Sequence, residues 1–379
     1  MKDSVVIFGA GAVGRGFIAR LVGANGVMPV FVEANVQLAR YLKETDGYIV
    51  HITGAEQKEH CVSGYRVLTT EQGEEISKVL SDCLFMATAV GGQNLEPVAR
   101  IVASGLADAA NQRDKPLNIL LCENWPDAEK VLAEALLKAG CSEERFATVR
   151  CCVERMVRRG ENELDLIAEN GQPFYVDRRM WRGEHGDDVC GIKGFTFSDN
   201  IEAIYARKLF TSNAGGAALA YFGHLSGCRF LYEALKITEI RKNLTDLLNV
   251  AKQCLIESFG LDQADLERHL DELMSRRFPD RDLADTVQRV ARNPLRKLGS
   301  QERLAGLVHL LQRHDFPTEP VSRVIGSALH YRDPADAESQ ELGRIIARKG
   351  PGAILEDVCV FKRQEKCFEE CLEFYDYYS

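Results

Sequence analysis

The sequence has no Cys-x-x-Cys pair, no internal repeat and no apolar run long enough to span a bilayer. It also lacks an excess of positive charge, since 47 Lys and Arg face 56 Asp and Glu and give a formal charge of −9. Nucleic acids and membrane surfaces are bound through clustered positive charge, so this composition argues against both as partners. A local basic pocket for a small anion is still compatible with it. The N-terminus does not have the layout of a signal peptide, and we expect a cytoplasmic protein.

Twelve cysteines are scattered along the chain, several of them inside apolar runs. Cys151 and Cys152 are adjacent, which turns their side chains to opposite faces of a strand. Cys367 and Cys371 share a helical face, but no second ligand pair follows them closely. Metal sites need such closely spaced pairs. We therefore expect small buried side chains in a reducing compartment and no bound metal.

A chain of 379 residues is too long for one core of ordinary size, so two domains are expected. In residues 1–195, short apolar strands alternate with helical patterns. The strands are expected at 5–10, 29–34, 83–90 and 118–124, and the helices near 13–24, 36–43, 95–103 and 128–138. This alternation predicts an α/β, Rossmann-type domain with a mainly parallel, doubly wound sheet. Further strands are expected at 48–53, at 65–70 and between 146 and 197, with a loop over 183–194.

Residues 196–379 are almost wholly helical in pattern, which predicts a mostly α-helical second domain. Helices are expected over 204–221, 229–258, 264–276, 283–292, 301–313, 321–331 and 338–349. Prolines punctuate the connections between them.

The run Gly9-Ala10-Gly11-Ala12-Val13-Gly14 matches Gly-x-Gly-x-x-Gly directly after the first strand and at the start of a helix. In that setting Gly9 permits a tight turn, Gly11 lets a pyrophosphate approach the backbone, and Gly14 lets the helix pack on the strand. The helix N-terminus adds free N–H groups and the positive end of a dipole. A glycine turn without a ligand is the simpler alternative, but the strand–turn–helix context favours a dinucleotide site.

Glu33 ends the second strand, and no Arg or Lys follows it immediately. A carboxylate there can accept both ribose hydroxyls of NAD and would repel the 2′-phosphate of NADP, so NAD is the expected cofactor. Ligands of such sheets lie beyond the carboxyl ends of the strands. The other expected cofactor contacts are therefore Ala10, Val13, Arg15, Ala89 and Val90, with Arg15 facing a phosphate.

Lys208 and Asn213 lie on an expected helix soon after the domain junction, and Asn124 ends an expected strand. A partly desolvated lysine can act as a base, and two amides can donate hydrogen bonds to a developing alkoxide. On a regular helix, residues five apart point in neighbouring rather than identical directions. Lysines on helices are more often simply solvated.

Arg289, Arg292, Arg296 and Lys297 form a cationic cluster that would suit a phosphate or carboxylate on a substrate. A solvated helix face is the plainer interpretation. His330 ends an apolar helix, where a packing role is as reasonable as substrate binding.

The sequence resembles the polyol-specific long-chain dehydrogenases over nearly its whole length. The resemblance lies in FGAGAVGRGFI (8–18), TAVG (88–91), LNILLCEN (117–124), ARKLFTSNAG (206–215), RVARNPLRKL (289–298) and ALHYRDPADAESQEL (328–342). It implies an NAD-dependent, metal-independent interconversion of mannitol 1-phosphate and fructose 6-phosphate. It further implies that Lys208 is the general base, that Asn124 and Asn213 stabilise the oxyanion, and that the arginine-rich segment lines the substrate pocket.

The chain departs from the family pattern at the histidine of Lys-x-x-x-x-Asn-x-x-His, where it has Gly216. His224, two helical turns further on, is a candidate replacement. The family signature Val-Asp-Arg-Ile reads Val153-Glu154-Arg155-Met156. These departures leave open a related enzyme for a free polyol or a sugar acid, or a non-catalytic NAD(H)-binding sensor. The family includes monomers, and no coiled-coil heptads suggest another state.

Overall fold

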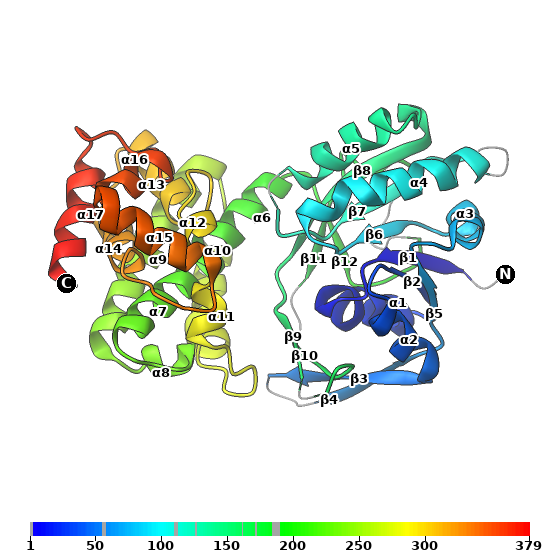
Figure 1. Ribbon diagram of the computed structural model, residues 1–379, viewed down its shortest axis with the longest axis horizontal. Helices are drawn as coiled ribbons and strands as arrows, with labels where there is room; N and C mark the ends of the chain where they lie inside the picture. The colour runs from blue at the N-terminus through cyan, green and yellow to red at the C-terminus, as the bar shows by residue number, and fades with distance from the viewer. Residues whose placement is uncertain are drawn as a thin grey trace. The chain divides into compact units, whose positions relative to one another are not determined.

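The computed structural model describes residues 3–54, 58–109, 113–125, 127–160, 162–170, 173–183 and 190–379. The chain divides into two compact units, Met1–Ile201 and Glu202–Ser379 (Figure 1). The strands of both sheets belong to the first unit, and the second unit is built of helices. Among the described residues no helix is both long and apolar enough to cross a bilayer.

The large sheet of the first unit has eight strands in the order β12-β11-β8-β7-β6-β1-β2-β5. Their bounds are β1 Ser4–Phe8, β2 Met28–Glu33, β5 Arg66–Thr69, β6 Met86–Thr88, β7 Leu117–Leu121, β8 Phe146–Val153, β11 Phe174–Asp177 and β12 Phe195–Ser198. Neighbouring strands are parallel except for β8 and β11, which pair antiparallel. The expected mainly parallel sheet is confirmed.

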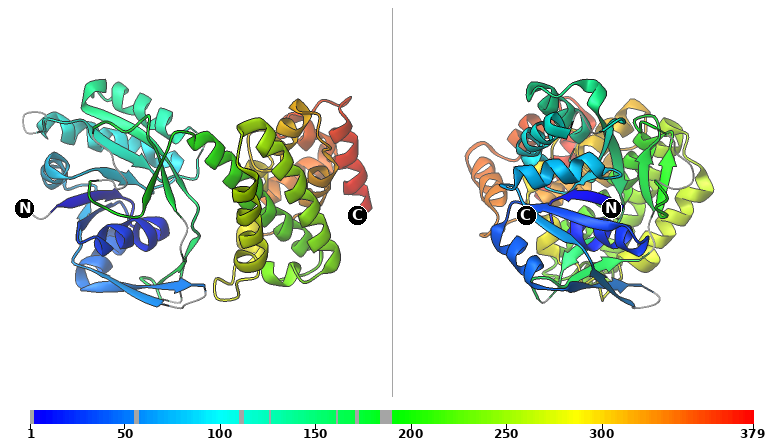
Figure 2. Two further views of the ribbon diagram at one scale, coloured as in Figure 1. Left: turned by 180° about the vertical axis from the view of Figure 1, so that it is seen from behind. Right: turned by 90° about the vertical axis from the view of Figure 1, so that its right-hand side faces the viewer.

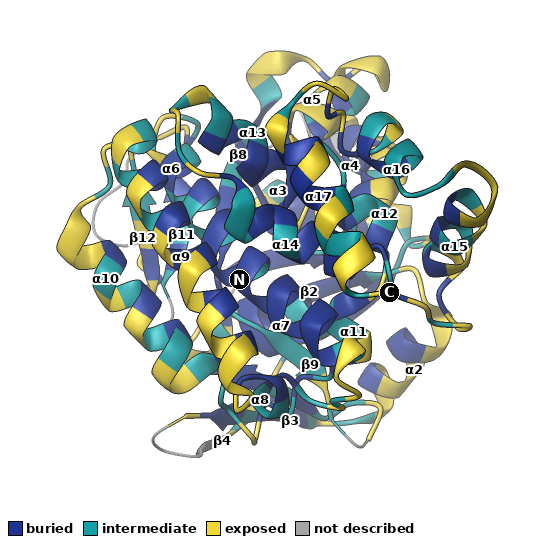
Figure 3. Cartoon of the chain, turned by 90° about the vertical axis from the view of Figure 1, so that its left-hand side faces the viewer, coloured by how far each residue is buried: buried dark blue, intermediate teal, exposed yellow. Residues whose placement is uncertain are grey.

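Helices cover both faces of this sheet, which is why its strands are continuously apolar. Along β1, Val5 and Ile7 join one core cluster and Val6 and Phe8 join the other, because successive side chains of a strand point to opposite faces. The first cluster includes η1 (Gly14–Ala19), α1 (Arg20–Ala24) and α2 (Val36–Glu44), and the second α3 (Gly73–Asp82), α4 (Leu95–Ala109) and α5 (Ala128–Lys138). Figure 3 colours the residues by burial, and β2 is buried over residues 29–32.

A second sheet has the order β4-β3-β10-β9, with bounds β4 Lys58–Ser63, β3 Gly47–Thr53, β10 Leu166–Glu169 and β9 Val157–Arg159. It lies on the side of η1 and α1, where Val50 and Leu166 share a core cluster with Phe17 (Figure 2). The expected strand at 48–53 is therefore present, but in this small sheet. The partner strand β4 was not predicted, because KEHCVS has neither the apolar run nor the alternation of an ordinary strand.

The helical unit is centred on α7, which is buried from Ala214 to Gly223. The helices α8, α9, α11 and α14 pack against it. Helix α6 begins at the last residue of the first unit. The helices have the bounds α6 Ile201–Arg207, η4 Lys208–Asn213, α7 Ala214–Leu225, α8 Leu231–Ala234, α9 Thr238–Phe259, α10 Gln263–Glu272, η5 Leu273–Arg277, α11 Val287–Ala291, α12 Pro294–Lys297, α13 Ala305–Arg313, α14 Glu319–Ala328, α15 Ala337–Lys349, α16 Gly352–Asp357 and α17 Lys366–Tyr377.

Several features of this unit differ from the sequence expectation, among them the short helices α12 and α16, which were not predicted. The helix expected over 229–258 is two helices, because the backbone is extended at Ile237, with φ −75° and ψ 119°. The helix expected over 204–221 contains the π-helical turn η4. The C-terminal helix α17 was not predicted. In the first unit, residues 184–189 of the loop expected over 183–194 lie outside the described part of the chain.

Candidate active site

The glycine loop after β1 is fitted to its surroundings at two positions and open at a third. Gly9 has φ +93°, and a Cβ on it would lie 2.5 Å from the carbonyl oxygen of Ala89. A Cβ on Gly14 would lie 2.0 Å from the carbonyl oxygen of Gly9. At Gly11 a Cβ would meet no atom within 4 Å. Gly9 and Gly14 are thus required by the fold, whereas the space beside Gly11 is available to a ligand. Val13 follows on the turn that enters η1.

Glu33 joins the end of β2 to the glycine loop. Its carboxylate accepts the N–H of Ala10 at 2.6 Å and the N–H of Asn35 at 2.8 Å. The side chain is partly exposed. A carboxylate offers about four acceptor sites, so it retains capacity for ribose hydroxyls. The sequence did not show that Glu33 also holds the loop.

The side chain of Arg15 has its hydrogen-bond partners inside the protein. The residue is fully buried, and its guanidinium donates to the carbonyl oxygens of Ala10 at 2.7 Å and Leu164 at 3.0 Å. It also lies over the ring of Tyr48. Burial lowers the pKa of Arg15. In this structure Arg15 ties the loop to the segment before β10, and it shows no free donor edge facing solvent.

The segment after β6 lies against the glycine loop. The N–H groups of Val90 and Gly91 both donate to the Glu123 carboxylate, at 2.9 and 2.8 Å. Sequence analysis missed Glu123, although its position in the Cys-Glu-Asn end of β7 was a usable signal. Glu123 fixes the backbone at Ala89 and Val90, the expected cofactor contacts. Its neighbour Asn124 is exposed, and its side chain has no hydrogen-bond partner among the described residues.

The π-helical turn changes the relation between Lys208 and Asn213. The N–H of Ala214 donates to the carbonyl of Leu209, five residues earlier, as a π-helix requires. On an α-helix, residues five apart would point about 140° apart, since each residue adds about 100°. A π-turn stacks residues five apart, so Lys208 and Asn213, its two end residues, lie on one side of the helix. Both are partly exposed.

The four cationic residues expected in the substrate pocket have different surroundings. Arg289 is paired with Asp285 (Nε–Oδ1 2.5 Å), and Arg296 with Glu302 (2.9 Å). Lys297 is 5% exposed, and its amine donates to the carbonyls of Val290 and Arg292. Burial, reinforced by neighbouring arginines, lowers the pKa of Lys297 to about 6. Arg292 is exposed and has no side-chain ion pair within the described chain.

The position of the family histidine lies between α7 and α11. A Cβ on Gly216 would have one neighbour, Val290 Cγ1 at 3.8 Å. The structure thus brings Gly216 close to the helix that carries Arg289. His224 is held elsewhere, because its Nε2 accepts the N–H of Arg332 at 3.4 Å and its ring packs edge-on against Tyr331.

His330 is held by the C-terminal helix. Its ring stacks on Tyr375 with centroids 4.3 Å apart, and its Nε2 lies 2.8 Å from the Tyr375 carbonyl oxygen. These contacts show that His330 packs against α17.

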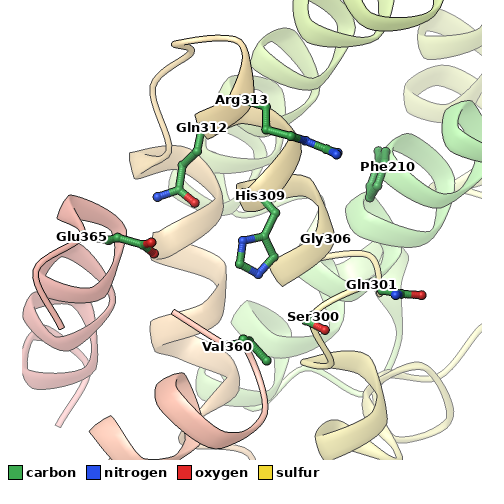
Figure 4. Close-up of a pocket in the computed structure, with 9 residues that line it drawn as sticks. All are labelled: Phe210, Ser300, Gln301, Gly306, His309, Gln312, Arg313, Val360 and Glu365. Atoms are coloured by element: carbon green, nitrogen blue, oxygen red, sulfur yellow. The ribbon is translucent and has the colours of Figure 1, made fainter. Parts of the chain in front are cut away.

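A cavity of about 710 Å³ lies in the helical unit beside α13 (Figure 4). Phe210 of η4 borders it, and His309, Arg313 and Glu365 supply charged or polar groups. The Nε2 of His309 is already 2.8 Å from the Cys359 carbonyl oxygen. None of the expected site residues lines this cavity.

The sheet order, the glycine loop and Glu33 define an NAD-binding oxidoreductase with a separate helical unit. Two family models match the chain, the mannitol dehydrogenase Rossmann domain over residues 3–182 and the mannitol dehydrogenase C-terminal domain over residues 200–365. The chain belongs to the mannitol dehydrogenase family, and it is an NAD-dependent polyol dehydrogenase by class.

Two curated relatives are similar along most of their length. The mannitol-1-phosphate 5-dehydrogenase of Arthrobacter sp. (strain FB24) is 34% identical over 351 residues, covering 90% of each chain. The enzyme of that name from Bacillus velezensis is 31% identical and covers 94% of this chain and 95% of its own.

Two solved structures share the fold at low identity. The mannitol 2-dehydrogenase of Pseudomonas fluorescens, solved with NAD and D-mannitol, gives a TM-score of 0.77 at 14% identity, covering 99% of this chain and 92% of its own. A D-sorbitol dehydrogenase in substrate-free form gives 0.80 at 16% identity, covering 99% and 93%. At such identity the likeness supports the fold alone.

Proposed function

We propose that this chain interconverts a polyol phosphate and a ketose phosphate, of the mannitol 1-phosphate and fructose 6-phosphate type, with NAD. The observation that supports the proposal is the π-turn Lys208–Asn213, whose closure five residues apart brings the positions of these two residues to one side of a helix. Two relatives that cover nine-tenths of the chain are named mannitol-1-phosphate 5-dehydrogenase, which supports the phosphorylated substrate.

In this proposal Lys208 is the general base that takes the proton of the substrate hydroxyl. As charge builds on that oxygen, the amides of Asn213 and Asn124 donate hydrogen bonds to it. When bound, NAD supplies the hydride acceptor. The proposed cofactor residues are Gly9, Ala10, Gly11, Val13, Gly14, Glu33, Ala89 and Val90. We propose that Arg15 supports the glycine loop from inside the protein, because its guanidinium donates to backbone carbonyl oxygens.

Arg292 is the proposed partner of the substrate phosphate. Arg289 and Arg296 already have carboxylate partners, and Lys297 donates to backbone carbonyls. Arg292 follows α11, whose other side meets α7 beside Gly216. A planar guanidinium can bind a phosphate through two parallel hydrogen bonds. Arg289, Arg296 and Lys297 are then proposed to shape this corner of the pocket.

The test is NADH formation with mannitol 1-phosphate and NADH consumption with fructose 6-phosphate. Lys208→Ala should lower kcat about 10²- to 10⁴-fold, because the proton acceptor is lost. Lys242→Ala is the matched control, since Lys242 is an exposed lysine of α9 in the same unit. Equal activity of wild type and Lys208→Ala would refute the assignment of the base.

Phosphate specificity has its own test in Arg292→Gln. Loss of one charged hydrogen-bonding group, worth about 1.5–3 kcal/mol, should raise KM for mannitol 1-phosphate about 10- to 100-fold. Arg344→Gln on α15 is the control. Turnover of a free polyol or a sugar acid alone would show that Gly216 marks a changed pocket. NADH binding without turnover on the whole panel would favour the sensor.

The proposed partner is thus a small polyol or sugar phosphate. We propose the cytoplasm as the compartment, because its reducing conditions keep cysteine thiols reduced.

A further inference from the structure

His269 is a titratable group that the proposed chemistry does not use, yet it meets the π-turn. It lies on α10, 58 positions along the chain from Thr211. Its Nε2 is 2.9 Å from Thr211 Oγ1 and 3.5 Å from Ser212 Oγ. Thr211 is fully buried and Ser212 is 6% exposed. One imidazole nitrogen thus reaches two successive hydroxyls between Lys208 and Asn213.

The hydrogen bonds around Thr211 fix their own direction. Thr211 Oγ1 lies 2.6 Å from the carbonyl oxygen of Arg207, which can only accept. A hydroxyl has one proton to donate. The Thr211 hydroxyl therefore donates to the carbonyl oxygen of Arg207 and must accept a hydrogen bond from His269. The Nε2 of His269 is then the protonated nitrogen, and it donates to Thr211.

These bonds act on the feature that distinguishes the turn from an ordinary helix. Thr211 bonds the carbonyl at the last residue before the π-turn, while the N–H of Ala214 closes the turn on Leu209. Side-chain bonds of Ser and Thr to a carbonyl four residues earlier offer the backbone an alternative to regular α-helical pairing. The hydrogen bond from His269 on a second helix, here called the clamp, holds the Thr211 side chain in this arrangement.

We propose that His269 is a positioning residue that holds the π-turn through Thr211, and so keeps Lys208 and Asn213 on one side of the helix. The catalytic consequence rests on the proposed function. His269 does not need to touch substrate, cofactor or reacting atoms. Burial and the nearby charges of Arg207 and Arg277 lower the pKa of His269 to about 3, so the imidazole is a neutral donor.

The experiment uses the full chain and two pairs of variants. Thr211→Val removes the hydroxyl and keeps the shape, whereas Thr211→Ser keeps the hydroxyl. His269→Phe removes the donor. Ser322→Ala is the control, because it removes a buried hydrogen bond of 2.9 Å to Glu370, which joins α14 to α17 and involves no residue of η4. It should lower stability as a merely structural loss does.

The activity readout is kcat against KM for NAD. T211V and H269F should lower kcat about 10²-fold, the cost of a misplacement of about 1 Å of catalytic groups. KM for NAD should not change, since the proposed cofactor residues lie in the other unit. T211S should restore most of the activity, and S322A should keep the wild-type kcat per folded molecule. Unchanged kcat in T211V, or an equal loss in S322A, would overturn the proposal.

The second readout needs no substrate, and it separates this inference from the proposed function. Amide hydrogen exchange over residues 208–214 should accelerate at least tenfold in T211V and H269F, and not in T211S or S322A. If wild type turns over no polyol phosphate, the proposed function fails and exchange alone decides the clamp. If H269F does not fold, the T211V and T211S pair decides it. Equal exchange in that pair would count against the clamp.

Discussion

Gly11→Ala should separate nucleotide binding from folding. A Cβ on Gly11 meets no atom within 4 Å, so the variant should fold normally. Replacing Gly with Ala at a compatible position stabilises a protein by about 0.4–1 kcal/mol, through the unfolded state. Gly14→Ala is the contrasting variant, because its Cβ would lie 2.0 Å from the carbonyl oxygen of Gly9. That variant should unfold or fail to accumulate.

Gly11→Ala should weaken NADH binding, because the new methyl group would occupy the open space beside residue 11. If the pyrophosphate occupies it, the new methyl displaces a charged group from backbone N–H donors, and charged hydrogen bonds contribute about 1.5–3 kcal/mol each. A loss of about 2 kcal/mol weakens binding about 30-fold. At a concentration 100 times the wild-type Kd, NADH should stabilise wild type by about 2.7 kcal/mol and Gly11→Ala by about 0.9 kcal/mol.

Urea denaturation with and without NADH measures both quantities in one series. The stability of the ligand-free variant checks the open space, and the increment with NADH checks the site. An unfolded Gly11→Ala would mean that the space is needed by the protein itself. A full NADH increment in the variant would refute the placement of the pyrophosphate beside Gly11.

Three further outcomes follow from the structure. Gly216→Ala should stabilise the chain by about 0.5–1 kcal/mol, because its Cβ has one neighbour at 3.8 Å. Gly215→Ala should destabilise the chain by about 1–3 kcal/mol, because its Cβ would lie 3.0 Å from Phe278. Urea denaturation of both variants tests these opposite changes in stability. The pKa of Lys297 is lowered from 10.5 to about 6, so the unfolded chain binds more protons between those values. Stability should therefore rise with pH across that window by at most about 1.4 kcal/mol per pH unit, and a Lys297→Met variant with the same slope would contradict this. Glu33→Gln should reduce the preference for NAD over NADP and also loosen the loop, because an amide nitrogen would face the N–H of Ala10 or Asn35; KM values for both cofactors test it.

Much of the sheet-based unit could be predicted because its signals are local. The strand before Gly9 is a continuous apolar run, and the glycine spacing places a turn and a helix after it. Gly9 and Gly14 then meet the backbone contacts that the motif implies. The small sheet could not be foreseen in the same way. Its strand β4 has a half-polar sequence, and its strand β3 also pairs with β10, which comes from a distant part of the chain.

Charged residues were harder to place than apolar ones, because their partners decide where they point. Arg15 and Arg292 look alike in the sequence, each beside a glycine- or proline-marked turn. In the structure Arg15 is buried against three carbonyl oxygens, while Arg292 is exposed. Glu33 was expected at a ribose, and its hold on Ala10 and Asn35 was not foreseen. The partners of Arg15 at 163 and 164 lie about 150 positions away, beyond any local pattern.

In the helical unit, the one extra residue in the π-turn η4 decides the relative direction of the proposed catalytic residues. Apolar periodicity over 204–221 indicates one helix, and one continuous helical segment is present from Ile201 to Leu225. The apolar periodicity does not reveal that η4, in the middle of this segment, closes with a hydrogen bond five residues apart. The buried positions of α7 continue directly after η4, so the pattern shows no break. The relative direction of Lys208 and Asn213 depends on that closure. Since His269 and Thr211 lie on different helices, the closure is set by a tertiary hydrogen bond, and the geometry of the proposed base and oxyanion donor is a property of the folded unit rather than of their spacing.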